Sequence, residues 1–321
     1  MKALFILSKD NPELASAEFK AVMKKDFDID DNLAVCDCNE DEIKKAKKRL
    51  AYCNSAFQLL FSCKAPELDK KMQDFDWQGV YNDSFVIRQI NCKGNKLKDE
   101  AYYAGFVWRK VKNPKVDLKE ARTKIFIICN KKVYVGLFLG EMDKSYLQRR
   151  AAMKPSMHPT AIDPKLAKGM VNLTGCEKNE IVADPFCGTA GILIEAGLMG
   201  MKTIGVDISG KMLKLADLNL SRNRVKYWHL TEGDATKISV KCDHVVSDLP
   251  YGRNSRITEK LEDLYLNFLK NIKKWKINRA ILSFPDSIDY KGIIKKSNFK
   301  IEEEFEIYMH KSLTKKIVVL K

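Results

Sequence analysis

Apolar residues in the first 64 positions recur with two different spacings. Alternating or continuous apolar runs predict strands, whereas apolar residues three and four positions apart predict one face of a helix. The expected elements are strands at 3–8, 27–29, 33–38 and 56–63 and helices at 12–25 and 42–52. Their order (strand, helix, two strands, helix, strand) predicts a small ferredoxin-like domain at residues 1–64.

A second compact α+β unit is predicted at residues 65–140, after Pro66 and a charged stretch. It is expected to contain strands at 84–90, 124–129 and 133–138 and a basic, aromatic-bearing helix at 97–111. Arg109, Lys110 and Lys112, in and just after this helix, are candidate RNA contacts, because clustered positive charge attracts a polyanion. A generic α+β module that binds no nucleic acid is the alternative.

The sequence of residues 141–160 is polar and irregular and predicts a linker, in which Arg149 and Arg150 are further candidate RNA contacts. Over residues 161–321, strand-like and helical segments alternate. This alternation predicts an α/β fold, a Rossmann-like domain whose mostly parallel sheet is covered by helices on both faces. Two strand-like segments near the end, at 299–309 and 315–321, are expected to form an antiparallel edge.

A glycine-containing turn follows the first strand of this region, in the segment Asp184-Pro185-Phe186-Cys187-Gly188-Thr189-Ala190-Gly191. Ligands of open α/β sheets bind outside the carboxyl ends of the strands, where glycines allow close approach to the backbone. Asp207 ends the next strand 23 residues after Asp184, near the ~20-residue interval at which an acidic residue meets ribose hydroxyls. Asp234 ends a third strand, where it could accept a hydrogen bond from an adenine amino group.

These carboxylates predict a nucleoside site, for which two cofactors compete. A dinucleotide site would show G-x-G-x-x-G, but Asp184 and Phe186 stand where that motif would be. The turn therefore favours S-adenosylmethionine, an adenosyl ligand with an amino-acid tail. The residues expected to bind it are Asp184, Phe186, Cys187, Gly188, Thr189, Gly191, Asp207, Ile208, Asp234 and Ala235. No metal site is expected, because the cysteines and histidines do not cluster at zinc-ligand spacing.

The next strand runs into Asp248-Leu249-Pro250-Tyr251, the candidate catalytic residues. The lone pair of an exocyclic amine is delocalised into its ring, so a methyltransferase must orient the NH₂ group. The Asp248 carboxylate and the Leu249 carbonyl can each accept one N–H, and Tyr251 can stack on the base. Pro250 fixes its own φ, and Asp248 can accept the departing proton. An ordinary strand-terminating turn is the alternative.

Lysine and arginine number 57 against 42 acidic residues, a formal net charge of +15. This favours a nucleic-acid partner, with a lysine-rich surface that serves solubility as the alternative. Arg253 and Arg256 follow the catalytic turn and could hold a phosphate or a guanine edge, unless they belong to a solvated loop. Nine scattered cysteines predict mostly buried, reduced thiols in a cytoplasmic protein, with neither a secretion signal nor a membrane-spanning segment.

Residues 248–251 resemble the D/N/S-P-P-Y/F motif of N6-adenine and N2-guanine methyltransferases, with Leu249 in place of the first proline. Three longer segments resemble the archaeal and eukaryotic THUMP-domain enzymes that methylate N2 of guanosine 10 in tRNA. They are DPFCGTAGILIEAGLMG at 184–200, MHPTAIDPKLAKGMVNL at 157–173 and HKSLT at 310–314. The resemblance is strongest over residues 149–321. Ala190 departs from it, because relatives often carry glycine there, so its methyl group must point away from the ligand.

The resemblance implies a ferredoxin-like unit and a tRNA-gripping THUMP domain in front of the methyltransferase domain. It implies S-adenosylmethionine-dependent methylation of guanosine N2 in tRNA, once or twice. Methylation of guanosine 6 is an alternative that Asp248 disfavours, because that sister family usually has asparagine there. Adenine-N6 methylation would use the same tetrapeptide, and a tRNA-binding protein without catalytic activity is a possibility of another class. A monomer, alone or with an accessory protein, is the expected form.

Overall fold

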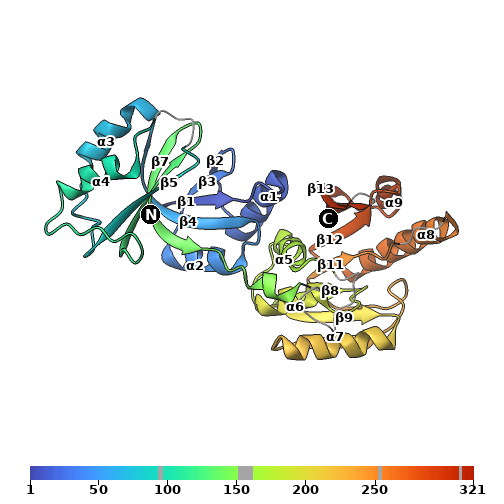
Figure 1. Cartoon of the computed structure of the whole chain (residues 1–321). Coiled ribbons are helices and arrows are strands. Elements are labelled where there is room, and N and C mark those ends of the chain that lie inside the picture. The colour runs from blue at the N-terminus through green and yellow to red at the C-terminus, as the bar shows by residue number, and fades with distance from the viewer. Residues whose placement is uncertain (93–96, 151–161, 252–254, 311–312) are drawn as a thin grey trace. The chain divides into compact units, whose positions relative to one another are not determined.

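The computed structural model describes residues 1–92, 97–150, 162–251, 255–310 and 313–321. These residues form two compact units, each with its own seven-stranded sheet (Figure 1). The N-terminal unit comprises Met1–Pro12, Lys25–Lys47 and Cys53–Met142, and the C-terminal unit comprises Glu13–Lys24, Lys48–Tyr52 and Asp143–Lys321. None of the described helices combines the length and the hydrophobicity that crossing a lipid bilayer requires.

The sheet of the N-terminal unit has the strand order β2-β3-β1-β4-β7-β6-β5. Its strands are β1 (Lys2–Leu7), β2 (Asp28–Asp30), β3 (Leu33–Asp37), β4 (Cys53–Cys63), β5 (Phe85–Ile90), β6 (Thr123–Cys129) and β7 (Val133–Glu141). Its helices are α2 (Glu40–Arg49), α3 (Leu68–Asp74) and α4 (Glu100–Trp108). The first four strands pair antiparallel in the order β2-β3-β1-β4, which is the arrangement that the predicted ferredoxin-like pattern requires.

Strand β4 joins the two regions of the front half that the sequence pattern predicts as separate domains. Its 11 residues pair with β1 along one edge and with β7 along the other. The expected boundary at residue 64 therefore falls inside one continuous sheet. Strands β5 and β6 run parallel, and α4 lies in the connection between them. Trp77, Phe85 and Tyr103 are fully buried in the core of this part of the unit.

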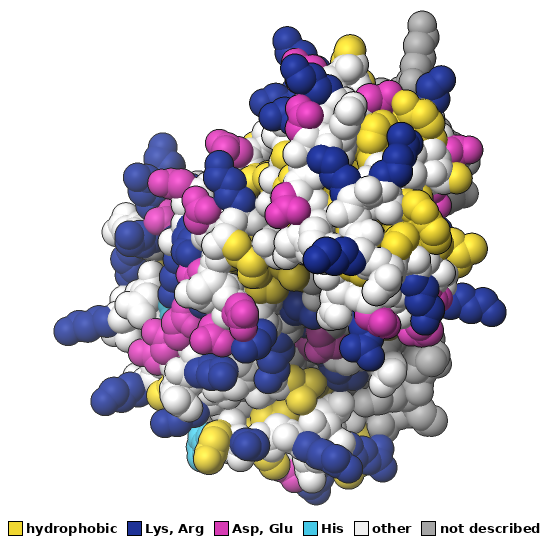
Figure 2. Space-filling model, turned by 90° about the vertical axis from the view of Figure 1, so that its left-hand side faces the viewer, with side chains coloured by type: hydrophobic (Ala, Val, Ile, Leu, Met, Phe, Trp, Pro, Cys, Tyr) yellow, Lys and Arg dark blue, Asp and Glu magenta, His cyan; other side chains and the backbone are white. Residues whose placement is uncertain are grey.

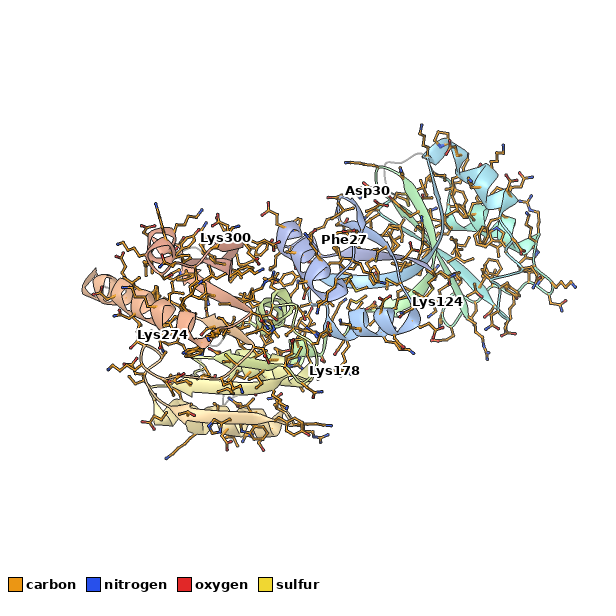
Figure 3. All side chains as sticks on the ribbon, turned by 180° about the vertical axis from the view of Figure 1, so that it is seen from behind. Phe27, Asp30, Lys124, Lys178, Lys274 and Lys300 are labelled. Atoms are coloured by element: carbon orange, nitrogen blue, oxygen red, sulfur yellow. A yellow bond between two sulfur atoms is a disulfide. The ribbon has the colours of Figure 1, made fainter. Side chains whose placement is uncertain are left out.

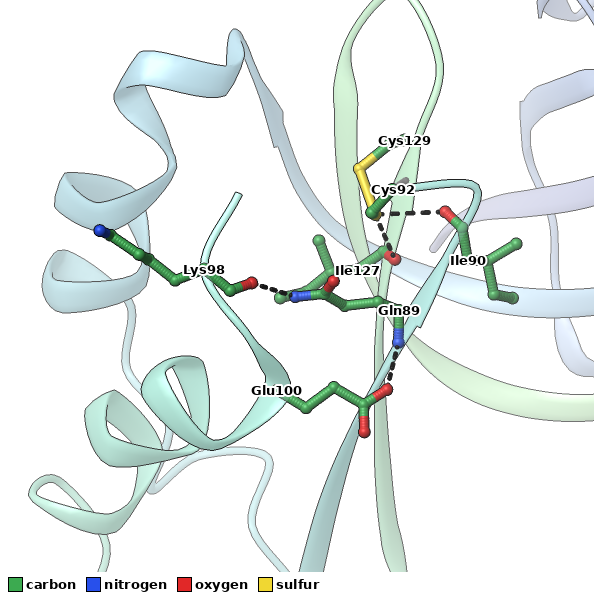
Figure 4. The surroundings of a disulfide bond; sticks show 7 residues. All are labelled: Gln89, Ile90, Cys92, Lys98, Glu100, Ile127 and Cys129. Carbon is green, nitrogen blue, oxygen red and sulfur yellow. Dashed lines mark hydrogen bonds between the residues drawn. A yellow bond between two sulfur atoms is a disulfide. The ribbon is translucent and has the colours of Figure 1, made fainter. Parts of the chain in front are cut away.

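A disulfide joins Cys92, which follows β5, to Cys129 at the end of β6 (Figure 4). The expectation of reduced thiols is therefore wrong for this pair. The reason is that the pairing of β5 with β6 brings together two residues 37 positions apart in the sequence. Beside the disulfide, the Glu100 carboxylate accepts a hydrogen bond from the Gln89 N–H at 2.9 Å. The seven free cysteines are all buried, as predicted.

The sheet of the C-terminal unit has the strand order β10-β9-β8-β11-β12-β14-β13. Its strands are β8 (Ile181–Asp184), β9 (Lys202–Asp207), β10 (Trp228–Glu232), β11 (His244–Asp248), β12 (Arg279–Pro285), β13 (Ile301–His310) and β14 (Leu313–Leu320). Its helices include α5 (Pro164–Leu173), α6 (Gly191–Leu198), α7 (Gly210–Arg222), α8 (Ser255–Ile272) and α9 (Tyr290–Lys296). Strands β8 to β12 pair parallel, and β14 pairs antiparallel with β12 and β13. This confirms the predicted α/β fold with an antiparallel edge.

A buried polar network ties α1 (Pro12–Met23) to α5 within the C-terminal unit. The Glu18 carboxylate accepts hydrogen bonds from two backbone N–H groups at 2.9 and 2.8 Å and from the Asn172 side chain at 2.7 Å. The Arg49 guanidinium donates to the Asn172 side-chain oxygen at 2.9 Å. Burial raises the pKa of Glu18. Since a buried charge is costly without partners, the three side chains depend on one another.

Replacing Asn172 with alanine is expected to lower the free energy of unfolding by about 2–4 kcal/mol, because Glu18 and Arg49 each lose a buried partner. Urea unfolding followed by circular dichroism measures the loss. The matched control Asn278→Ala removes an exposed amide and is expected to change the free energy of unfolding by less than about 0.5 kcal/mol. Equal stability of the two variants would contradict the role of the network.

Candidate active site

Four aspartates of the C-terminal unit lie at one edge of its sheet. Asp184, Asp207 and Asp248 are the last residues of β8, β9 and β11, and Asp234 follows the end of β10. Because these strands are parallel neighbours, their carboxyl ends share that edge. A cavity of about 500 Å³ lies there. Its lining includes every residue predicted as catalytic or cofactor-binding: Asp184, Phe186, Cys187, Gly188, Thr189, Gly191, Asp207, Ile208, Asp234, Ala235, Asp248, Leu249, Pro250 and Tyr251.

The Asp184 side chain is buried next to the turn that follows β8. Its Oδ1 accepts hydrogen bonds from the Ser247 hydroxyl at 2.6 Å and from the Phe186 N–H at 3.1 Å. Burial raises the pKa of Asp184 to about 7, and the nearby charges of Asp248 and Asp207 add to this rise. Asp184 therefore titrates near neutral pH, where a positively charged ligand would favour its ionised form.

The turn between β8 and α6 is organised by Asp207. Its two carboxylate oxygens accept hydrogen bonds from the N–H groups of Gly188 and Ser209, each at 2.9 Å. Gly188 has a φ of +49°, and a Cβ there would have no neighbour within 4 Å, so the glycine leaves open space for a ligand. Ala190 has a φ of +70° but packs in a core cluster with Leu193. Its methyl group thus points away from the cavity, as expected.

The Asp234 carboxylate is held by the segment that follows it. One oxygen accepts hydrogen bonds from the backbone N–H and the hydroxyl of Thr236 at 2.9 and 2.7 Å, and the other lies 3.1 Å from the Lys237 Nζ. These hydrogen bonds, above all those from Thr236, lower the pKa of Asp234. Ile208 also lines the cavity and is 76% exposed, so it offers an apolar surface to an aromatic ring of a ligand.

Hydrogen bonds hold the candidate catalytic turn, residues 248–251 at the end of β11, on both sides. The Leu249 N–H donates to the Ser283 carbonyl of β12 at 3.1 Å, a bond that proline at this position could not make. The Leu249 side chain is buried in the core, so an apolar side chain suits this position, where the D/N/S-P-P-Y/F motif has its first proline. The Tyr265 hydroxyl of α8 donates to the Pro250 carbonyl. Tyr251 stays 40% exposed, so its ring is accessible to a base.

A cation that sequence reasoning missed, Lys315 of β14, contacts Asp248. The Lys315 Nζ lies 2.7 and 2.6 Å from the two carboxylate oxygens of Asp248 and 5.1 Å from the centroid of the Tyr251 ring. The two residues are 67 positions apart, and the pairing of β14 with β12 brings them together. The one available signal was a lysine at the start of the apolar run KKIVVLK.

The predicted RNA contacts are distributed over both units. Arg109, Lys110 and Lys112 are exposed just after α4 in the N-terminal unit. Arg149 lies within the C-terminal unit, where its guanidinium bonds to both carboxylate oxygens of Glu195 at 2.6 and 2.8 Å. The Arg149 side chain is only 13% exposed, so it offers little surface to an RNA phosphate.

The other basic candidates lie at the surface or outside the described residues. Arg150 is half-exposed and pairs with Asp163 at 3.1 Å, whereas Arg253 and the side chain of Arg256 fall outside the described part of the chain. Figure 2 shows lysine and arginine side chains spread over one face, with acidic and exposed hydrophobic side chains between them. Lys178, Lys274 and Lys300 are exposed on the C-terminal unit (Figure 3).

Two family models match the chain. One, described as the RMKL-like methyltransferase domain, matches residues 151–316. The other, described as a DNA methylase, matches residues 23–217 and so ends before the candidate catalytic turn. The first match spans the whole cavity and all four strand-end aspartates.

Curated relatives and solved structures agree with the first match. The chain is 31% identical over 334 residues to a tRNA (guanine(10)-N2)-dimethyltransferase of Methanothermobacter thermautotrophicus, covering 100% of this chain and 99% of the relative. It is also 31% identical to the enzyme of that name from Methanocaldococcus jannaschii, with 87% of each chain covered. The crystal structure of TrmN from Thermus thermophilus has the same fold, with a TM-score of 0.56 at 17% identity over 100% of this chain and 99% of that one. This chain belongs to the family of tRNA (guanine(10)-N2)-dimethyltransferases.

Proposed function

We propose that the protein transfers methyl groups from S-adenosylmethionine to the exocyclic N2 of guanosine 10 in tRNA, giving N2-methyl- and N2,N2-dimethylguanosine. The observation that carries the proposal is the placement of Asp248-Leu249-Pro250-Tyr251 in the same cavity as three further strand-end carboxylates. The two relatives named above, which align with 100% and 87% of this chain, support guanosine 10 as the target.

The cavity suits S-adenosylmethionine because its lining combines negative and apolar groups. The cofactor carries positive charges on its sulfur and its amino group, and Asp184, Asp207 and Asp234 line the cavity. Asp207 would hold the ribose hydroxyls, Asp234 the adenine amino group beside Ile208, and the open turn at Gly188 the amino-acid tail. When bound, the cofactor supplies a methyl group on a positively charged sulfur.

The residues of the catalytic turn orient the amine. The Asp248 carboxylate and the Leu249 carbonyl each accept one N–H of the NH₂ group, which leaves the nitrogen lone pair directed into the cavity. Tyr251 stacks on the base, and the fixed φ of Pro250 sets the distance between these groups. Asp248 accepts the proton that leaves the nitrogen.

The N-terminal unit is proposed to bind the tRNA as a ferredoxin-like region followed by a THUMP domain, which residues 65–140 would form. Arg109, Lys110 and Lys112 support this assignment, since three exposed cations in four positions after α4 suit phosphate groups. The sheet continuous through β4 and β7 would then carry both parts of the RNA-binding region as one body.

Incubation of the protein with isotope-labelled S-adenosylmethionine and an unmodified tRNA transcript tests the proposed reaction. We expect N2-methylguanosine and then N2,N2-dimethylguanosine at position 10, identified by mass spectrometry of nuclease fragments. Asp248→Ala should reduce the rate by ~10²–10⁴, because an acceptor for the amine and its proton is lost. Methylation at guanosine 6, or of an adenine, would replace the proposed target, and a fully active Asp248→Ala enzyme would overturn the assigned role.

Affinity for the cofactor is expected to rise as the pH passes through about 7, the pKa of Asp184. Below this pH, the Asp184 carboxyl is protonated and neutral, and above it the carboxylate attracts the cationic cofactor. Titration calorimetry with S-adenosylmethionine between pH 5.5 and 8.5 measures the change. Asp184→Asn is the control, since it should bind weakly with no dependence on pH in this range. A wild-type affinity that is flat across pH 7 would contradict the prediction.

Replacing Arg109, Lys110 and Lys112 together with alanine is expected to weaken tRNA binding without changing cofactor affinity. The slope of log K against log [salt] should fall by about 2–3, since each phosphate contact contributes ~0.7–0.9. Fluorescence anisotropy with labelled tRNA at several salt concentrations measures the slope. The control variant carries alanine at Lys295, Lys296 and Lys300, three exposed lysines of the C-terminal unit. An equal effect in both variants would indicate general charge attraction only.

A further inference from the structure

Tyr265 of α8 is fully buried, and its hydroxyl donates a hydrogen bond to the Pro250 carbonyl in the candidate catalytic turn. Its ring belongs to the core, where it packs edge to face against Phe284 of β12, with 5.6 Å between the ring centroids. Burial raises the pKa of the Tyr265 phenol, and the charge of Asp248 adds to this rise. The hydroxyl therefore stays protonated and can act as a donor at neutral pH.

The hydrogen bond acts on the backbone rotation that decides where Tyr251 begins. The ring of Pro250 fixes its own φ, and the peptide bond that follows Pro250 is planar. The ψ of Pro250 is then the rotation that sets both the direction of its carbonyl and the position of the Tyr251 Cα. A donor that holds this carbonyl therefore fixes the point from which the Tyr251 ring extends.

The same helix supports the turn that is proposed to hold the cofactor. Phe268 comes three residues after Tyr265 and so lies on the same face of α8. Its ring packs edge to face against Phe186, with 5.0 Å between the ring centroids. Phe186 belongs to the turn after β8 and lines the cavity. One turn of α8 thus contacts both the turn that would hold the methyl donor and the turn that would orient the amine.

We propose that Tyr265 is a positioning residue, which fixes the candidate catalytic turn relative to the turn at Phe186 and so sets the distance between the target amine and the methyl donor. The inference rests on the proposed methyl transfer. Tyr265 acts through the Pro250 carbonyl and the Tyr251 ring. Because the rate of a transfer step depends steeply on the placement of the reacting atoms, a displacement of about 1 Å can cost about a hundredfold.

The test removes one hydroxyl from each of two tyrosines in the same core cluster. Tyr265→Phe deletes the donor to Pro250 and keeps the ring beside Phe284. The control Tyr290→Phe deletes a hydroxyl that donates to the Glu304 carboxylate at 3.2 Å. The Tyr290 ring also packs on Phe284, with 5.6 Å between the ring centroids. Both variants lose a hydrogen bond next to the same ring, but only Tyr265→Phe releases the turn.

The rate of a single turnover is measured with the enzyme in excess over an unmodified tRNA transcript and with saturating S-adenosylmethionine. In Tyr265→Phe, we expect this rate to fall about tenfold to a hundredfold, while the dissociation constants for tRNA and S-adenosylhomocysteine stay within about threefold of the wild type. Tyr290→Phe should keep the wild-type rate. 4-Aminophenylalanine in place of Tyr265 retains a donor and should restore most of the rate. An unchanged rate in Tyr265→Phe, or an equal fall in both phenylalanine variants, would overturn the proposal.

One measurement separates failure of this inference from failure of the proposed reaction. The protein is labelled with ¹³C-tyrosine, and the ring resonances of Tyr251, assigned by their loss in Tyr251→Phe, are recorded in the complex with S-adenosylhomocysteine. They should shift or broaden in Tyr265→Phe and keep their wild-type positions in Tyr290→Phe. If the wild type methylates no guanosine, the proposed function fails, while this comparison still decides the role of Tyr265. Tyr251 resonances that are unchanged in Tyr265→Phe, or displaced equally in both variants, would overturn that role.

Discussion

Parallel strands that end at one edge of a sheet bring their last side chains together, and the active site of the C-terminal unit depends on this constraint. Strands β8, β9 and β11 end in Asp184, Asp207 and Asp248, and the first turn after β10 adds Asp234. No local preference of the chain would gather four carboxylates around one cavity. The sheet does so because its parallel strands present their carboxyl ends at one edge.

Carboxylates that lie close together repel one another, which costs free energy. The structure offsets this repulsion with different partners at different aspartates. Asp207 accepts two backbone N–H groups, whereas Asp248 receives the ammonium of Lys315. Asp184 is buried and relies on the Ser247 hydroxyl and one backbone N–H, and its pKa rises to about 7. Side chains of identical chemistry thus differ in their burial and in their hydrogen-bonding partners, as acidic residues in enzyme sites commonly do.

The division of the chain into units does not follow the order of the sequence. Helix α1 lies near the start of the chain but most of it belongs to the C-terminal unit, where Glu18 bonds to Asn172, 154 residues away. Strand β4, in turn, makes one sheet of two regions whose patterns suggest separate domains. Both features come from pairings that link distant segments, so the limits of each unit are set by tertiary contacts and not by position along the chain.

The sequence by itself determined the parts of the site that are local in the chain. The strand-end aspartates, the turn at Gly188 and the candidate catalytic tetrapeptide could be placed at one cavity because each follows a predicted strand, and the topology of α/β sheets says where such residues meet. Only the tertiary structure decided that Lys315 pairs with Asp248, that Arg149 is committed to Glu195, and that two cysteines join β5 and β6. Periodicity reports which face of an element is buried, but it carries no information about which distant face packs against it.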